Sequence, residues 1–169
     1  MKIIKHLSFI ILLSLVGCAT NSNFTKNNLN NEYFKGKTIV FTLNKNSKKS
    51  LSYSGPRAGY ERQPDLKEAF NIAIEELAKE TKLDLKFNEG NNELNKNEII
   101  VDSEITEILW AFDLSSATMK TSLNYTLKSN NKIFKINGIY KNMSGGAEKG
   151  NLIRSLKIAN YSFLKELEK

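Results

Sequence analysis

The feature that most constrains the fold is a long region in which apolar and polar residues alternate, from residue 98 to residue 142. A period of two places successive side chains on opposite faces of a strand. Two short polar breaks divide the region into three predicted strands, at residues 98–112, 117–128 and 132–142. The middle strand has the cleanest apolar face, formed by Met119, Thr121, Leu123, Tyr125 and Leu127. The pattern predicts an antiparallel meander with one dry and one wet face.

The two outer strands of the meander carry less regular patterns. In the third strand, Gly138 interrupts an inward-facing series and is predicted to form a bulge. In the first strand, strict alternation places Asp102, Glu104 and Thr106 on one face and Glu107 on the other. Residues 108–112 are apolar on both faces. Either another part of the chain covers the second face, or the stretch is exposed as a patch for a partner or a lipid.

Two amphipathic helices accompany the strands. The first is predicted at residues 65–81, where Asp65 and Glu68 form a pattern like a capping box. Its apolar face contains Leu66, Ala69, Phe70, Ala73, Leu77 and Ala78. The second follows the glycine-rich stretch 144–150, with Asn151 as its predicted cap. Its apolar face contains Leu152, Leu156, Ala159, Phe163 and Leu167.

Two further strands, at residues 37–45 and 82–88, precede the meander. The element order is therefore strand, helix, strand, three-stranded meander and helix. This order predicts an α+β fold: a two-layer sandwich with a mostly antiparallel sheet of about five strands and two helices packed on one face.

The N-terminal segment has a different character. Lys2 and Lys5 precede an apolar run at residues 7–16, which is too short to cross a bilayer and has the form of a secretory signal peptide. The run ends in Leu15-Val16-Gly17-Cys18, and Cys18 is the only cysteine of the chain. This stretch resembles the lipobox of bacterial lipoproteins, whose cysteine is acylated and becomes the first residue after cleavage. The alternative is a plain secretory signal, with Cys18 incidental to it.

The resemblance to the lipobox implies a division of the chain into three parts. Residues 1–17 are a cleaved signal peptide, residues 18–35 are a lipidated cysteine with a flexible asparagine-rich tether, and residues 36–169 form a single α+β domain. Lipid on Cys18 would attach the protein to a membrane, because two or more acyl chains give stable anchoring.

Composition then restricts the chemistry. Cleavage would remove two lysines and the only histidine, His6, and would lower the formal net charge from +7 to +5. Without histidine, histidine-dependent triads and ordinary zinc sites are excluded, and no cofactor or metal is predicted. The basic excess suits anionic envelope material such as lipid head groups or glycan phosphates. Export makes nucleic acid an unsuitable partner.

The candidate binding residues fall in two places. The long polar segment 46–64 contains Arg57, Tyr60 and Arg62, which are residue types favoured at binding hot spots. Lys120 and Lys128 are predicted on the wet face of the meander. Together they suggest a surface for an anionic partner, and the alternative is a solvated connector with incidental charge.

Asp102 and Glu104 are the candidates for catalysis. A carboxylate pair can perform acid–base chemistry on a glycan. Alternate acids on a half-exposed strand also occur simply because that face is wet, and neither acid lies in an apolar stretch that would raise its pKa. The sequence therefore predicts no catalytic residue and favours a protein that is not an enzyme.

The arrangement resembles the YajG-type family of small envelope lipoproteins, through Asp-Leu-Lys-Glu-Ala-Phe at 65–70 and Ile-Asn-Gly-Ile-Tyr at 136–140. The resemblance implies a non-enzymatic outer-membrane lipoprotein that binds or scaffolds in the periplasm. Ala19 after the cysteine implies outer-membrane delivery under enteric-type sorting. Two alternatives stay open. The element order also resembles the lipopolysaccharide-assembly lipoprotein, which plugs a β-barrel translocon, and a glycan-active enzyme would use Asp102 and Glu104.

Overall fold

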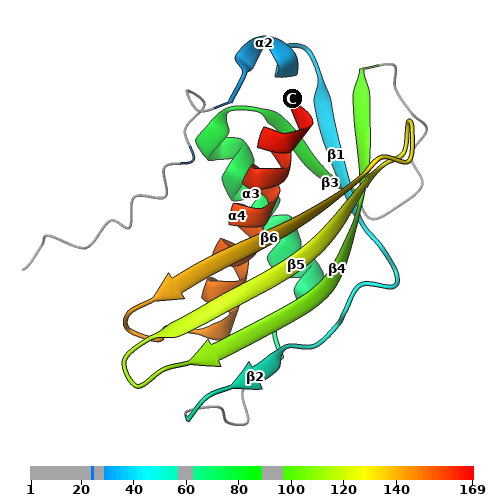
Figure 1. Ribbon diagram of the computed structural model, residues 1–169. Coiled ribbons are helices and arrows are strands. Elements are labelled where there is room, and N and C mark those ends of the chain that lie inside the picture. Colours follow the sequence, from blue (N-terminus) through cyan, green and yellow to red (C-terminus); the bar gives the residue numbers. More distant parts are fainter. Residues whose placement is uncertain (1–23, 25–28, 57–62, 89–96) are drawn as a thin grey trace, which may run out of the picture.

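The protein folds as a twisted sheet with two long helices packed on one face, as the computed structural model in Figure 1 shows. The structure describes Phe24 and residues 29–56, 63–88 and 97–169. Its elements are α2 (Asn31–Phe34), β1 (Thr38–Leu43), β2 (Ser52–Ser54), α3 (Leu66–Thr81), β3 (Asp84–Asn88), β4 (Glu98–Phe112), β5 (Ala117–Leu127), β6 (Ile133–Asn142) and α4 (Glu148–Leu167). The predicted α+β class is confirmed.

The sheet is mixed, with strand order β3-β1-β4-β5-β6 and the short β2 paired to β4. β1 lies parallel to both neighbours, so that Ile39 is opposite Leu85 of β3 and Ile99 of β4. β4, β5 and β6 form the predicted antiparallel meander. The two halves differ because β1 reaches β3 through a helix, whereas the meander strands follow one another through short turns.

Aromatic side chains fill the space between the sheet and the helices. The rings of Tyr125 and Phe163 stack with centroids 4.4 Å apart, and Phe41 meets both edge-on. Leu123 and Phe163 are 1 % and 0 % exposed, so the predicted dry faces of β5 and α4 are confirmed. The Tyr125 hydroxyl donates to Asn160 Oδ1 at 2.7 Å, and its burial raises the pKa of Tyr125 well above its ordinary value.

A β-bulge in β4 corrects the predicted faces of that strand. Ile105 is opposite Leu123 and Glu107 is opposite Ser122, which leaves Thr106 as an extra residue. Glu107 therefore lies on the same face as Glu104, and the prediction that it lies on the opposite face is wrong. The extra residue reverses the alternation that a count along the strand assumes.

The same bulge determines which side chains of the apolar stretch 108–112 are buried and which face outward. Ile108 and Trp110 turn inward and are buried, at 0 % and 2 % exposed. Leu109, Ala111 and Phe112 are half-buried. The Trp110 ring packs against Phe112 with centroids 4.5 Å apart. The stretch is therefore largely part of the core rather than an exposed patch.

Gly138 has a different role from the predicted bulge, because β6 pairs with β5 without a register shift. A Cβ at Gly138 would lie 1.9 Å from the Ser155 carbonyl oxygen of α4. The Ser155 hydroxyl donates to the Gly138 carbonyl at 2.9 Å and is hydrogen-bonded to Thr121 Oγ1 at 3.0 Å. Glycine thus allows the backbones of strand and helix to touch.

The two helix starts differ in how well the sequence predicts them. The Asp65 carboxylate accepts from Glu68 N–H at 3.0 Å, as the capping pattern predicts. α4 begins at Glu148, before the predicted cap at Asn151. Asn151 is instead buried in the first turn, where its amide donates to the Gly145 carbonyl at 2.6 Å. Asn151 therefore stabilises the preceding glycine-rich turn by a hydrogen bond rather than capping the helix.

The domain also begins earlier than the predicted boundary at residue 36. Leu29 and Phe34 are buried, and the Asn30 side chain accepts from two N–H groups of α2. The Asn30 N–H donates to Glu168 Oε2 at 2.6 Å, next to the chain end marked C in Figure 1. Residues 29–35 are therefore part of the domain rather than of a flexible tether, because two apolar residues suffice to dock this short stretch.

Candidate functional site

The described part of the polar segment after β1, residues 44–56, lies against β4. The Asn44 N–H donates to the Ser103 carbonyl and the Lys48 N–H to the Ile105 carbonyl, both at 2.8 Å. β2 then pairs with residues 109–111 of β4. Gly55 has a φ of +97°, and a Cβ there would lie 2.0 Å from the Phe112 carbonyl oxygen. The segment thus covers the edge of β4 beyond β1, which protects backbone groups that would otherwise be unpaired.

The structure describes only part of the predicted binding set. Arg57, Tyr60 and Arg62 lie outside the described residues. The Lys120 amine lies 3.0 Å from the Glu107 carboxylate, and Lys128 is exposed just beyond the end of β5. At roughly 3.4 Å per strand residue, the two lysines are about 27 Å apart. The structure therefore does not bring Lys120 and Lys128 together in one site.

Asp102 and Glu104, the candidate catalytic pair, lie on the face of the sheet that the helices leave open. Asp102 accepts from Asn44 Nδ2 at 2.6 Å, and Glu104 accepts from Asn124 Nδ2 at 3.2 Å. A hollow of about 270 Å³ on this face, beside the bulge, is lined by Thr106, Ser122, Leu123, Asn124, Lys135, Ile136 and Asn137, and neither carboxylate lines it. Both carboxylates are thus engaged by amide donors on a half-exposed surface.

Glu107 also lies on this face, and its neighbours lower its pKa. The Lys120 amine and the Ser122 hydroxyl, which donates at 3.1 Å, lower the pKa of Glu107, and the charge of Lys48 adds to the effect. The bulge is what brings Glu107 beside Lys120, because without the extra residue its side chain would turn toward the helices.

A second charged cluster lies between the helices. The Lys157 side chain is 7 % exposed, and its amine lies 2.9 Å from Glu76 and 2.8 Å from Glu80. Burial alone would lower the pKa of Lys157, but the hydrogen bonds to Glu76 and Glu80 outweigh it and raise the pKa. The cluster ties α4 to α3, and its charges satisfy one another.

Among the cavities formed by the described residues, the one with the largest excess of positive charge lies at the carboxyl ends of β1 and β3. We call it the lysine pocket; it has a volume of about 500 Å³. It is lined by Leu43, Asn44, Lys45, Ser47, Lys48, Lys49, Pro64, Asp65, Leu66, Lys67 and Phe87. Four lysines and one carboxylate give it a positive excess. Sequence analysis missed it, because its lining comes from three separate stretches and only Lys48-Lys49 appears as a local cluster of charge.

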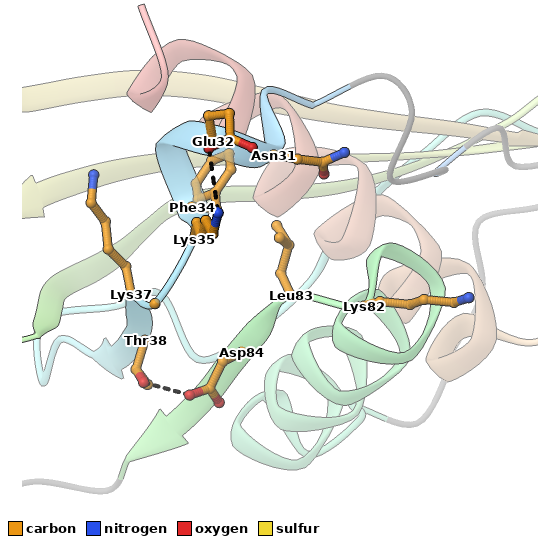
Figure 2. A pocket seen from close by; sticks show the side chains of 10 residues that line it. Asn31, Glu32, Phe34, Lys35, Lys37, Thr38, Lys82, Leu83 and Asp84 are labelled. Atoms are coloured by element: carbon orange, nitrogen blue, oxygen red, sulfur yellow. Dashed lines mark hydrogen bonds and ion pairs between the residues drawn. The ribbon is translucent and has the colours of Figure 1, made fainter.

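A cavity of similar size, about 510 Å³, lies at the amino ends of the same strands, next to α2 (Figure 2). Both of its acids have partners. Thr38 donates to Asp84, and the Lys35 amine lies 3.8 Å from Glu32. Figure 2 shows Lys82 extending away from both acids, beyond the end of α3. This second cavity offers no comparable excess of charge.

The described residues offer neither a metal centre nor a membrane span. No group of three or more potential metal-ligating side chains gathers within these ranges. None of the helices in the described part of the chain is long and apolar enough to cross a bilayer.

Comparison with known proteins finds only distant likeness. No protein-family model matches the chain, and no curated protein matches it. Among solved structures, a PelC dodecamer from Paraburkholderia phytofirmans is 13 % identical over 77 % of this chain and 88 % of that chain, with a TM-score of 0.43. The hypothetical protein CT253 from Chlamydia trachomatis is 14 % identical over 78 % of this chain and 93 % of that chain, with a TM-score of 0.35.

A third structure, a neuraminyllactose-binding hemagglutinin homolog from Helicobacter pylori, is 11 % identical over 79 % of this chain and 84 % of that chain, with a TM-score of 0.27. These values indicate a coarse similarity of fold and carry no argument about function. The resemblance to the YajG-type family is not shown by any of these comparisons.

Proposed function

We propose that this protein is a non-enzymatic lipoprotein, anchored through Cys18 to the outer membrane, that binds or scaffolds envelope components on the periplasmic side. The observation that carries the proposal is the stretch Leu15-Val16-Gly17-Cys18 behind a short apolar run. The resemblance to the YajG-type family, stated above on sequence patterns, is consistent with such a role.

The packing of Phe24 supports a position close to the membrane. Its ring lies 4.9 Å from the Tyr161 ring and 5.7 Å from the Lys157 amine, on α4. Phe24 lies six positions after Cys18, and a fully extended stretch of that length reaches at most about 21 Å. A lipid on Cys18 would therefore keep α4 near the membrane surface rather than let the domain diffuse at the end of a long tether.

The candidate sites favour binding over catalysis. Asp102 and Glu104 hold hydrogen bonds to neutral amides on an open sheet face, where a glycan-hydrolysing acid would need a shielded position to keep its proton. The lysine pocket offers positive charge beside apolar surface, which suits recognition of an anion.

Cys18→Ser tests the anchor. We expect the variant to move from salt-washed membranes to the soluble fraction and to lose metabolic labelling by a palmitate analogue, because two acyl chains supply the membrane affinity. Ser22→Ala, in the same segment, should stay in the membrane pellet and keep its label. A Cys18→Ser protein that still pelleted would contradict the lipoprotein proposal.

Ala19→Asp tests the destination in an enteric-type host. The variant should shift from the outer-membrane to the inner-membrane fraction of a density gradient, with unchanged palmitate labelling. Delivery of both proteins to the same membrane would contradict the outer-membrane part of the proposal while leaving lipidation intact.

Two assays address the role itself. Purified protein should release no fragments from peptidoglycan; release that Asp102→Asn and Glu104→Gln abolished would favour the glycan-active alternative. Crosslinking in membranes, followed by identification of the captured protein, addresses the binding role. Capture of a large β-barrel would favour the translocon alternative.

A further inference from the structure

We propose that the lysine pocket binds an anionic amphiphile, a molecule with a phosphate or carboxylate group joined to an apolar chain. This inference deepens the binding role proposed above by naming a site and a class of ligand. The test below works in solution and without the anchor, so its failure would not bear on membrane attachment.

Two lysines of the pocket have no ion-pair partner within the described part of the chain. Lys45 and Lys49 are exposed at its rim, and neither forms an ion pair with any residue that the structure describes. Lys67, in the first turn of α3, also lines the pocket, but it has an interaction of its own and is not counted as uncompensated charge. Lys48 is shared with the open face, since its charge also acts on Glu107. Asp65 is the acid among the lining residues, and its carboxylate already accepts the Glu68 N–H.

The position of the pocket adds to this charge. It lies where the parallel strands β1 and β3 end and where α3 begins. The carboxyl ends of parallel strands are the usual place for ligands in such units, and the start of a helix carries a partial positive charge. The lysines, the strand ends and the helix therefore all favour an anion at the same point.

An apolar wall explains why we infer an amphiphile rather than a simple anion. Leu43 and Phe87 are half-buried side chains on the helix-facing side of β1 and β3, and Leu66 of α3 is a third apolar residue of the pocket lining. The volume of about 500 Å³ falls within the roughly 300–1,000 Å³ of ligand pockets. Inorganic phosphate would leave this wall exposed to water, whereas an alkyl chain would cover it.

The second cavity serves as an internal contrast. The cavity beside α2 has the same size but holds Glu32 and Asp84 among its lysines. Its acids are engaged by Lys35 and Thr38. The two cavities therefore have the same size, and they differ in their excess of positive charge.

The test uses the chain with Cys18→Ser, which removes the predicted acylation site. Isothermal titration calorimetry would measure binding of dodecyl phosphate, kept below its micelle concentration, against inorganic phosphate and neutral dodecyl maltoside. Replacing Lys45, Lys49 and Lys67 together by Gln should weaken dodecyl phosphate binding by about tenfold or more, because each partly exposed amine contributes a modest share. Binding should also weaken as salt rises from about 0.05 M to about 0.5 M.

The matched control replaces Lys79, Lys135 and Lys165, three exposed lysines outside the pocket, by Gln. It has the same net charge as the pocket variant and should change affinity by less than about twofold. Circular dichroism melting would confirm that both variants remain folded. Equal weakening in both variants would overturn the site and show a general charge effect.

The reference ligands test the two halves of the proposed chemistry. Inorganic phosphate binding as tightly as dodecyl phosphate would overturn the role of the apolar wall. Dodecyl maltoside binding as tightly would overturn the role of the lysines. Absence of measurable dodecyl phosphate binding by the folded protein would overturn the proposal altogether. Leu43→Asn should weaken dodecyl phosphate while leaving any inorganic phosphate binding unchanged.

Discussion

Alternate residues of the same strands lie on opposite faces of the sheet, and the two faces have different roles. On the covered face of β5, Leu123 and Tyr125 pack under the helices. On the open face, Ser122 and Asn124 hydrogen-bond acids of β4 across the strands. Apolar burial stabilises far more than exposed polar pairs do, so the covered face determines whether the chain folds. The open face is correspondingly free to change with little effect on stability.

The largest expected effect comes from emptying the covered face. Phe163→Ala removes a ring that contacts Tyr125, Phe41 and Phe134, and it should lower the free energy of unfolding by about 3–5 kcal/mol. Ile139→Ala, exposed on the open face of β6, should change it by less than about 0.5 kcal/mol. Urea unfolding measures both, and similar losses would contradict the contrast between the faces.

A side chain placed in the close contact between β6 and α4 should lower the free energy of unfolding somewhat less than Phe163→Ala does. The new methyl group of Gly138→Ala would collide with the Ser155 carbonyl, so we expect a loss of about 1–3 kcal/mol. Gly150→Ala is the matched control, because a methyl group at this position of α4 would meet no neighbouring atom within 4 Å. There alanine should stabilise by about 0.5–1 kcal/mol. The two variants should therefore shift thermal unfolding in opposite directions, and a neutral Gly138→Ala would show that α4 can move away.

A buried charge between the helices should contribute less than the aromatic core. Lys157→Met leaves Glu76 and Glu80 without their amine, and loss of these charged hydrogen bonds should cost about 1–3 kcal/mol. Lys79→Met, exposed near the end of α3, should be close to neutral. If Lys157→Met lowered the free energy of unfolding as little as Lys79→Met does, the cluster would contribute nothing to stability.

The same lysine gives a pH dependence. Although burial lowers its pKa, the hydrogen bonds to Glu76 and Glu80 raise the pKa of Lys157 above the ordinary value of 10.5. Its contribution is therefore complete below about pH 10.5 and is lost as pH rises through the higher pKa of the folded state. The difference in stability between the native protein and Lys157→Met should shrink in this alkaline range. A constant difference up to the end of the titration would contradict the assignment.

The smallest effect is expected on the open face. Lys120→Met removes the amine that chiefly lowers the pKa of Glu107, so that pKa should rise toward its ordinary value. In the native protein the interaction stabilises above the ordinary pKa of 4.5 and is lost as pH falls through the lower folded value. Carboxyl carbon chemical shifts from an NMR titration would follow Glu107 directly. An unchanged Glu107 titration in Lys120→Met would mean that Ser122 alone perturbs this acid.

Periodicity predicted most of the fold because burial imposes it. The inward series of β5 and the face of α3 are confirmed, since each long element has many residues that repeat the same signal. Short elements lack that repetition. β2 is only Ser-Tyr-Ser, and α2 contains four residues, so the formation of these two elements depends on contacts with distant parts of the chain.

Two kinds of feature could not be predicted from the sequence: a single extra residue within a strand, and a site formed by residues far apart in the chain. Thr106 looks like any other strand residue, yet as the extra residue of a bulge it reverses the face of Glu107. The sequence marks Gly138 as an interruption of the strand pattern, but only the position of Ser155 shows that its role is close packing. The lysine pocket joins Lys45, Lys67 and Phe87, and nothing local in the sequence indicates that these residues meet.

The hydrogen bond between Asn30 and Glu168 has a consequence for the order of folding. These residues are 138 positions apart, so this hydrogen bond can form only after the last helix has been made. Such long loop closures are late and slow steps. The contact between the first residues of the domain and α4 therefore forms late in folding, and removal of the final turn of α4 would abolish it.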